Sequence, residues 1–244
     1  MTVNRVLQKQ KAKELIRTTK PSMVLAGLVF VLFSVLIGWL SLRLTGVDSD
    51  TAMKVMDLLN SGKTDTAMTL INRSAPGAGA TLIDMLLHLA LGVVGAGFSL
   101  FTLNAVRRAG PVFGNLLDGF GMMPRLLFLL ILEYVFILLW SLLLVIPGLI
   151  AAYRYSFAVY IMLDHPEYSA MECLRRSKEM TQGYKWQLFI LDLSFILWWI
   201  ASVIPGAGYV VQIYFTPYKE AVHVLYYEEI RLNNGFNGGG YQYV

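Results

Sequence analysis

Five ionisable residues lie inside long apolar runs of this 244-residue chain: Glu133, Arg154, Asp192, Lys219 and Glu220. Charged side chains are costly in a lipid bilayer, and they usually face other protein groups or water. Counted at about 1.5 Å per helical residue from the basic end of each run, all five fall at a similar depth. We predict a buried polar layer in which Arg154 pairs with Glu133 or Asp192, and Lys219 with the other acid.

Tyrosines recur near the same depth: Tyr134, Tyr153, Tyr155, Tyr160, Tyr214 and Tyr218, of which Tyr153, Tyr155 and Tyr218 are assigned to the layer. The aromatic belt of membrane proteins lies at the interfaces, so tyrosines at mid-depth indicate a polar interior. Pro217 would free a backbone carbonyl near the layer, or simply kink its helix. The layer is either an ion-pair cluster that fixes helix register or a polar path or binding site.

The composition indicates a membrane protein. Hydrophobic residues make up 56% of the chain and charged residues 15%, against about 45–50% and 25% in soluble domains. Apolar runs of about 20 residues match the hydrocarbon core when they are helical. We predict an all-α, polytopic helical membrane protein with six transmembrane helices, at residues 22–43, 82–104, 126–146, 149–164, 186–204 and 207–229.

The Lys and Arg residues set the orientation. If the N-terminus is cytoplasmic, 14 of the 20 fall in inside segments and four outside, at Arg43, Lys54, Lys63 and Arg73. Cytoplasmic segments carry the excess of basic residues. We therefore predict a multi-pass protein with both termini in the cytoplasm. The same distribution explains the basic net charge without a nucleic-acid partner.

The sequence Val-Ile-Pro-Gly occurs twice, at 145–148 and 203–206, each time at the end of an apolar run. Proline ends a helix and glycine permits a sharp reversal, so Pro147, Gly148, Pro205 and Gly206 predict two tight turns. Between 140 and 160, seven of 21 residues are identical to those 58 positions later. We predict a parallel repeat of helical hairpins, each preceded by an interfacial helix.

This repeat divides the chain into a basic interfacial helix at 1–21, a first membrane hairpin at 22–104, and second and third units at 105–164 and 165–230. The first hairpin contains an external insertion at 45–80, in which Asp50 and Asp65 are predicted to cap two short helices. Ser169 and Glu172 have the spacing of a capping box, and Gly183 can end the helix that they open. Residues 231–244 are predicted to be a flexible cytoplasmic tail.

Other reactive residues give weaker signals. Asp84 and His88 share a helix face but lack a third metal ligand, so a hydrated helix end is the simpler interpretation. Arg175 and Arg176 could lower the pKa of Cys173, but no histidine is nearby in the sequence. Sequence signatures of zinc proteases, serine hydrolases and phosphate or dinucleotide loops are missing. We expect no catalytic residue, cofactor or metal site.

Residues 145–190 carry a family resemblance. The Ile-Pro-Gly turn is followed by Tyr-Arg-Tyr-Ser at 153–156, Asp-His-Pro-Glu-Tyr-Ser-Ala at 164–170, Arg-Arg-Ser at 175–177 and Gly-Tyr-Lys-Trp at 183–186. These motifs resemble the bacterial integral membrane family known as domain of unknown function 975, over about residues 80–230. The resemblance implies a multi-span fold in a bacterial cytoplasmic membrane and implies no established activity.

Three functions from different classes remain, and a membrane enzyme ranks last among them. The first is a non-enzymatic membrane component for assembly, scaffolding or stress adaptation, which the tight hairpins and the missing catalytic motifs favour. The alternative is a transporter or a lipid- or peptide-handling permease that uses the charged layer in the cytoplasmic half of the bundle. Partners are the lipid bilayer and, in either case, a lipid, peptide or protein.

Overall fold

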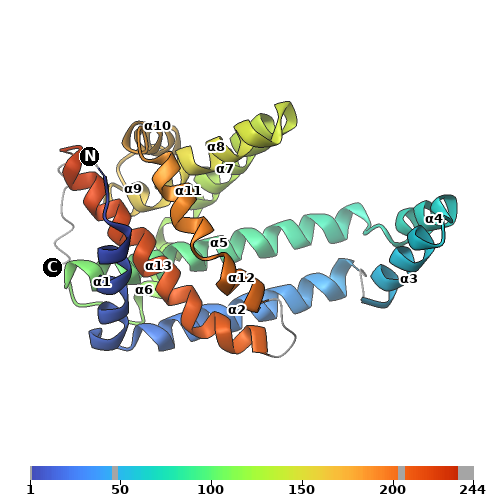
Figure 1. Cartoon of the computed structure of the whole chain (residues 1–244), viewed down its shortest axis with the longest axis horizontal. Helices are drawn as coiled ribbons and strands as arrows, with labels where there is room; N and C mark the ends of the chain where they lie inside the picture. The colour runs from blue at the N-terminus through green and yellow to red at the C-terminus, as the bar shows by residue number, and fades with distance from the viewer. Residues whose placement is uncertain (1, 46–48, 203–206, 236–244) are drawn as a thin grey trace. The chain divides into compact units, whose positions relative to one another are not determined.

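A computed structural model describes residues 2–45, 49–202 and 207–235, which form helices and contain no β-strand within these ranges (Figure 1). The chain divides into two compact units. One comprises residues 1–31 with 92–244, and the other comprises residues 32–91. Each unit is described by itself.

Four helical stretches of the described chain are long and apolar enough to cross a membrane. They are α2 (Met23–Thr45), α5 (Ala78–Arg107), Asn115–Leu143 and Val145–Asp164. The third contains α6 (Asn115–Asp118), the 3₁₀ helix η1 (Gly119–Met122) and α7 (Met123–Leu143); the fourth contains α8 (Val145–Tyr155) and α9 (Ala158–Asp164). The two remaining predicted spans correspond to α11 (Lys185–Leu193) with α12 (Ile196–Ser202), and to α13 (Ala207–Asn233).

The basic N-terminal segment forms α1 (Arg5–Thr18), which packs along α13 (Figure 1). Asn4 caps the helix by accepting a hydrogen bond from the Leu7 amide at 3.2 Å. Gln8, Ala12 and Ile16 recur at i, i+4 and i+8 and are buried, so one face of α1 contacts the bundle while its basic residues occupy the other faces.

The reversal between α7 and α8 takes place one residue before the first Val-Ile-Pro-Gly sequence. Leu144 is extended, with φ −163° and ψ 151°, and α8 begins at Val145. Pro147 therefore lies in the first turn of α8, where its missing N–H costs nothing, and does not end the preceding helix. A Cβ at Gly148 would lie 2.0 Å from Ser141 Oγ and 2.8 Å from Ser141 Cα, so this glycine is what lets α8 approach α7. The second copy, with Pro205 and Gly206, lies outside the described residues.

The predicted span at 149–164 is two helices, because α8 ends at Tyr155 and α9 begins at Ala158. The interruption is held by α10 (Ala170–Met180): Ser177 Oγ donates to the Arg154 carbonyl at 2.9 Å and accepts from the Phe157 amide at 3.2 Å. Thr181, one turn later, also donates to the Arg154 carbonyl, at 3.3 Å. The hydroxyls of α10 thus satisfy backbone groups that a continuous helix would have paired internally.

The ends of α10 follow the sequence prediction. Ser169 accepts a hydrogen bond from the Glu172 amide at 3.2 Å, and Gly183 adopts a φ of +85° after the helix ends. The buried face of α10 consists of Ala170, Cys173, Leu174, Ser177 and Met180. This helix is therefore packed into its unit by one face.

α13 continues through Pro217 for 27 residues. Pro217 has no N–H to donate to the Ile213 carbonyl, but the helix does not end there. The Pro217 ring packs on α2, where a Cβ at Gly27 would lie 2.8 Å from Pro217 Cδ. The two predicted repeat hairpins also differ in where their helices break. In the first predicted hairpin, the interruption lies in the second of its two spans, between α8 and α9. In the second predicted hairpin, it lies in the first of its two spans, between α11 and α12.

In the second unit, α3 (Ser49–Asn60) and α4 (Thr64–Ser74) pack against each other. Gly62 turns the chain with a φ of +73°, and the Lys63 amide donates to the Leu58 carbonyl at 2.9 Å. Asp50 and Asp65 lie one residue inside these helices and are not N-caps: α4 is preceded by Lys63, whose side chain caps nothing. Both carboxylates still favour the positive helix ends.

Candidate functional site

The five predicted charges do not form one ion-pair layer. Arg154 has no acidic partner within ion-pair distance in the described chain, and its guanidinium lies over the Trp140 ring at 5.6 Å. Glu133 on α7 likewise has no ion-pair partner among the described residues. The predicted Arg154 pairs assumed one continuous helix from 149 to 164, and the interruption after Tyr155 changes which residues its side chain can reach.

Asp192 and Lys219 have other partners than those predicted. His223 Nε2 lies 2.9 Å from Asp192 Oδ1, which joins α13 to α11. Lys219 Nζ lies over the Trp199 ring at 5.3 Å. Histidine was not among the predicted layer residues, so this acid–imidazole pair is a contact that the sequence analysis missed.

Glu220 on α13 accepts hydrogen bonds from hydroxyl groups of two other helices. Ser99 Oγ of α5 donates to its Oε1 at 2.6 Å, and the Tyr160 hydroxyl of α9 donates to the same oxygen at 3.1 Å. No Lys, Arg or His nitrogen of the described chain lies within 4 Å of its carboxylate. Both of its donors are hydroxyl groups, so this carboxylate is held by hydrogen bonds and has no opposite charge beside it in the described chain.

A cavity of about 260 Å³ borders Glu220. We call it the Glu220 cavity; it is lined by Phe30, Gly92, Gly95, Ala96, Phe98, Ser99, Ser156, Val159, Tyr160, Thr216 and Glu220. Glu220 is the only ionisable acid or base in this lining apart from the Tyr160 phenol. Phe30 and Phe98 stack with ring centroids 5.5 Å apart. An acid beside aromatic rings is the arrangement that binds organic cations.

A second cavity, of about 370 Å³, lies on another side of Glu220 and shares Tyr160, Thr216 and Glu220 with the first. Its wall also contains Lys219, His223 and Trp199. The fixed positive charge of Lys219 opposes the binding of a cation in this second cavity. The electrostatics therefore favour the Glu220 cavity as the cation site.

The tyrosines assigned to the layer pack in aromatic clusters, and Tyr153 also shares a side-chain hydrogen bond with Asp192, another predicted member of the layer. Tyr155 lies 6.0 Å from Phe136 between ring centroids, Tyr153 lies edge-on to Phe189 at 6.1 Å, and Tyr218 lies 5.8 Å from Phe195. The tyrosine that binds Glu220 is Tyr160, which the sequence analysis placed near the layer without assigning it to the site.

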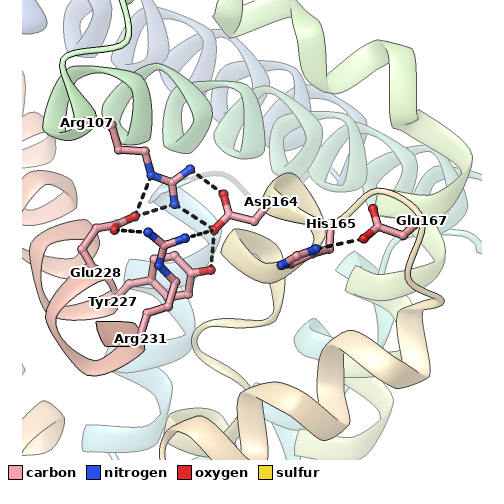
Figure 2. A network of polar contacts seen from close by, with 7 residues as sticks. All are labelled: Arg107, Asp164, His165, Glu167, Tyr227, Glu228 and Arg231. Carbon is pink, nitrogen blue, oxygen red and sulfur yellow. Dashed lines mark hydrogen bonds and ion pairs between the residues drawn. The ribbon is translucent and has the colours of Figure 1, made fainter. Parts of the chain in front are cut away.

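The strongest charge network lies elsewhere, where the ends of α5 and α9 meet α13 (Figure 2). Arg107 donates to both carboxylate oxygens of Asp164, at 2.7 and 2.8 Å, and to Glu228 Oε1 at 2.8 Å. Arg231 donates to Glu228 Oε2 at 2.8 Å, and the Tyr227 hydroxyl donates to Asp164 at 2.7 Å. Two arginines and two carboxylates compensate one another, which is typical of a structural network.

This network was not predicted from the sequence. Arg107 is one of the 14 basic residues assigned to the inside segments, and Asp164 is the first residue of the family motif at 164–170. The spacing of Tyr227, Glu228 and Arg231 places all three near one side of α13 and is the signal that could have identified it. Asp164, which is 4% exposed, is the most deeply buried of the four charged members.

Two further hypotheses concerned reactive side chains outside the predicted charged layer, namely Cys173 and the pair formed by Asp84 and His88. Burial raises the pKa of the Cys173 thiol to about 12, which outweighs the opposing effect of Arg176; the predicted lowering is therefore wrong. His88 Nδ1 lies 3.5 Å from Asp84 Oδ1. Among the described residues, no group of three or more His, Cys, Asp or Glu side chains could hold a metal ion.

The comparison with known proteins supports the family resemblance. Residues 141–234 match the family model described as "Protein of unknown function (DUF975)". The matched range runs from the end of α7 to the end of α13, and it is narrower than the range expected from the motifs. No curated protein and no solved structure matches the chain.

Proposed function

We propose that this chain is a multi-pass protein of a bacterial cytoplasmic membrane, with six spans and both termini in the cytoplasm. Four apolar stretches of sufficient length support membrane insertion. The uneven distribution of Lys and Arg supports the orientation. In this arrangement α11 with α12, and α13, provide the fifth and sixth spans.

Within that membrane we propose a non-catalytic permease that binds an ammonium group at Glu220. One observation carries this proposal: the Glu220 carboxylate borders a cavity and has hydroxyl donors but no cationic partner in the described chain. An acid inside a membrane bundle is costly unless something compensates its charge, so unpaired acids typically mark ion or substrate pathways. A bound cation would supply that compensation.

The lining indicates the class of ligand. Phe30 and Phe98 provide aromatic surfaces, and Gly92, Gly95 and Ala96 leave space beside them. A quaternary ammonium or primary amine could place its charge near Glu220 and its alkyl groups against the rings. The shared chemistry is an ammonium group on a small molecule, a peptide end or a lipid headgroup.

Uptake into proteoliposomes tests the permease role. The purified protein is reconstituted, and accumulation of radiolabelled tetraethylammonium is followed under an inside-negative potential. We expect uptake that is lost in Glu220→Gln and kept in Glu133→Gln, a matched change of an acid that lines neither cavity. Uptake of tetraethylammonium no greater than in protein-free liposomes would contradict the proposal that the protein is a permease.

A structural role in membrane assembly is the second candidate. It is supported by the network of Arg107, Asp164, Glu228 and Arg231, whose four charges are used within the protein. If this role is the main one, loss of the network should abolish the cellular phenotype while Glu220→Gln leaves it unchanged. A genetic complementation assay with Asp164→Asn and Glu220→Gln separates the two roles.

Cysteine labelling in intact cells tests the orientation. Ser61, in the turn between α3 and α4, and Lys178, on α10, are both exposed and can be changed to Cys in a Cys173→Ala background. A membrane-impermeant maleimide should label position 61 and should reach position 178 only after the cells are lysed. Labelling of position 178 but not 61 in intact cells would reverse the proposed orientation.

A further inference from the structure

We propose that the helical hairpin α3–α4 binds the surface of the lipid bilayer through an apolar face. This inference is independent of the Glu220 cavity and concerns only the unit formed by residues 32–91. The hairpin separates two apolar stretches that are able to cross a membrane, α2 and α5. Its own helices are only 12 and 11 residues long, too short to span a bilayer.

Each helix of the hairpin has three distinct stripes. On α3, Thr51, Val55 and Leu58 are partly buried, Asp50, Lys54 and Asp57 form a polar stripe, and Met53, Met56 and Leu59 form an exposed apolar stripe. On α4, Ala67, Leu70 and Ser74 are shielded, and Met68 and Ile71 are the exposed apolar side chains. Thr66, Thr69 and Arg73 form the polar stripe of α4 and are exposed. We call the five exposed apolar residues the apolar face of the hairpin; they are 42–62% exposed.

The two apolar stripes lie on the same side of the pair. Successive residues of a helix are rotated by about 100°. On each helix the apolar stripe is therefore rotated by roughly a quarter of a turn, or slightly more, from the stripe that packs on the other helix. The sense of this rotation is the same on both helices. In two antiparallel helices joined by a short loop, rotations of equal sense point to one common side. The polar stripes consequently face the opposite side, which makes the whole hairpin amphipathic.

The connection to α5 identifies the bilayer as the occupant of this face. Only Ala75, Pro76 and Gly77 separate α4 from α5, so α4 ends within about 10–14 Å of the start of an apolar stretch that is long enough to cross a membrane. The first turns of α5 continue the exposed apolar surface with Leu82, Ile83 and Leu86. An exposed apolar patch rimmed by polar residues marks an interaction site, and an amphipathic helix beside a membrane anchor can lie in the interface with that face in lipid.

Site-specific fluorescence on the full-length protein tests the proposal. In a Cys173→Ala background, single cysteines replace Met56 or Met68 on the apolar face, and Lys54 or Arg73 on the polar stripes as matched controls. All four positions are exposed, so the substitutions disturb no packing, and size-exclusion chromatography verifies folding. Each cysteine carries an environment-sensitive nitrobenzoxadiazole label, and the protein is reconstituted in phosphatidylcholine vesicles with lipids spin-labelled near the headgroup.

We expect blue-shifted emission at positions 56 and 68, and quenching by spin-labelled lipid at least threefold greater than at positions 54 and 73. Equal quenching on both faces, or none at 56 and 68, would overturn the proposal. Cross-linking between Met56→Cys proteins that rises with protein density, without lipid quenching, would also overturn it and would assign the face to a second copy. Blue-shifted emission at positions 56 and 68 that appears only after another protein is added would also overturn the proposal, and would assign the face to that protein.

Discussion

Arg107 at the end of α5 and Asp164 at the end of α9 form a two-point ion pair, with Nη1–Oδ1 and Nη2–Oδ2 distances of 2.7 and 2.8 Å (Figure 2). Each partner also contacts α13, through Glu228 and Tyr227 respectively. Residues 57 positions apart in the sequence are thereby joined to a third helix by one network. This pairing fixes the relative position of three helix ends more tightly than apolar packing alone would.

Asp164→Asn should therefore destabilise the protein. The change keeps the shape of the side chain but leaves Arg107 and Arg231 with one carboxylate between them. Breaking one side of a buried pair costs about 3–5 kcal/mol, and we expect about 3 kcal/mol because 24% of the Arg107 side chain remains exposed and solvent screens it. Thermal unfolding in detergent measures the loss. Glu179→Gln, which alters an exposed pair with Arg175, should change stability by less than about 1 kcal/mol.

Gly148→Ala should force α7 and α8 apart. The new methyl group would overlap Ser141, including its Cα, and overpacking of this kind costs about 1–3 kcal/mol. The matched control is Gly38→Ala in α2, where nothing lies within 4 Å of the added carbon. Alanine is the better helix former by about 1 kcal/mol, so this control should be neutral or slightly stabilising. Equal melting temperatures for the two variants would contradict the close packing of the hairpin.

Ser177→Ala should loosen the junction between α8 and α9. Thr181 still donates to the Arg154 carbonyl, but the buried Phe157 amide loses the Ser177 oxygen that accepts its hydrogen bond. An unsatisfied buried amide costs about 1–3 kcal/mol. Hydrogen exchange should accelerate at Phe157 and its neighbours, whereas Ser61→Ala in the exposed hairpin turn should leave exchange there unchanged. Unaltered exchange at Phe157 would show that the hydroxyl does not hold the junction.

Cys173 should react slowly with iodoacetamide at pH 8, since the pKa of its buried thiol is raised to about 12. The comparison is Met171→Cys in a Cys173→Ala background, which places a thiol on an exposed position of the same helix. A raised folded-state pKa means that the neutral thiol is favoured in the folded protein. Its contribution to stability is thus complete below about pH 9 and declines as the pH rises from 9 towards 12. Equal alkylation rates for the two thiols would contradict the burial of the Cys173 side chain.

Local patterns predicted the helices better than they predicted their contacts. The cap at Ser169, the turn near Gly148 and the two helices at 49–74 follow from residue types that act within one or two turns. That Arg154 lacks an acidic partner in the described chain could not be predicted, because its surroundings include a helix interruption whose backbone groups bind Ser177 and Thr181, more than 20 residues away. Glu220 was predicted by its position in an apolar run, but Ser99 and the cavity beside it depend on packing between helices distant in the sequence.

Equilibrium binding of tetraethylammonium to the purified protein tests the central claim, that Glu220 binds an ammonium group. We predict saturable binding by the wild type, a Kd raised at least about tenfold in Glu220→Gln, equivalent to about 1.4 kcal/mol, and no change in Glu133→Gln. Lys219→Gln should leave the affinity unchanged or improve it, because it removes a positive charge near the acid. Equal affinity in the wild type and Glu220→Gln would contradict the account.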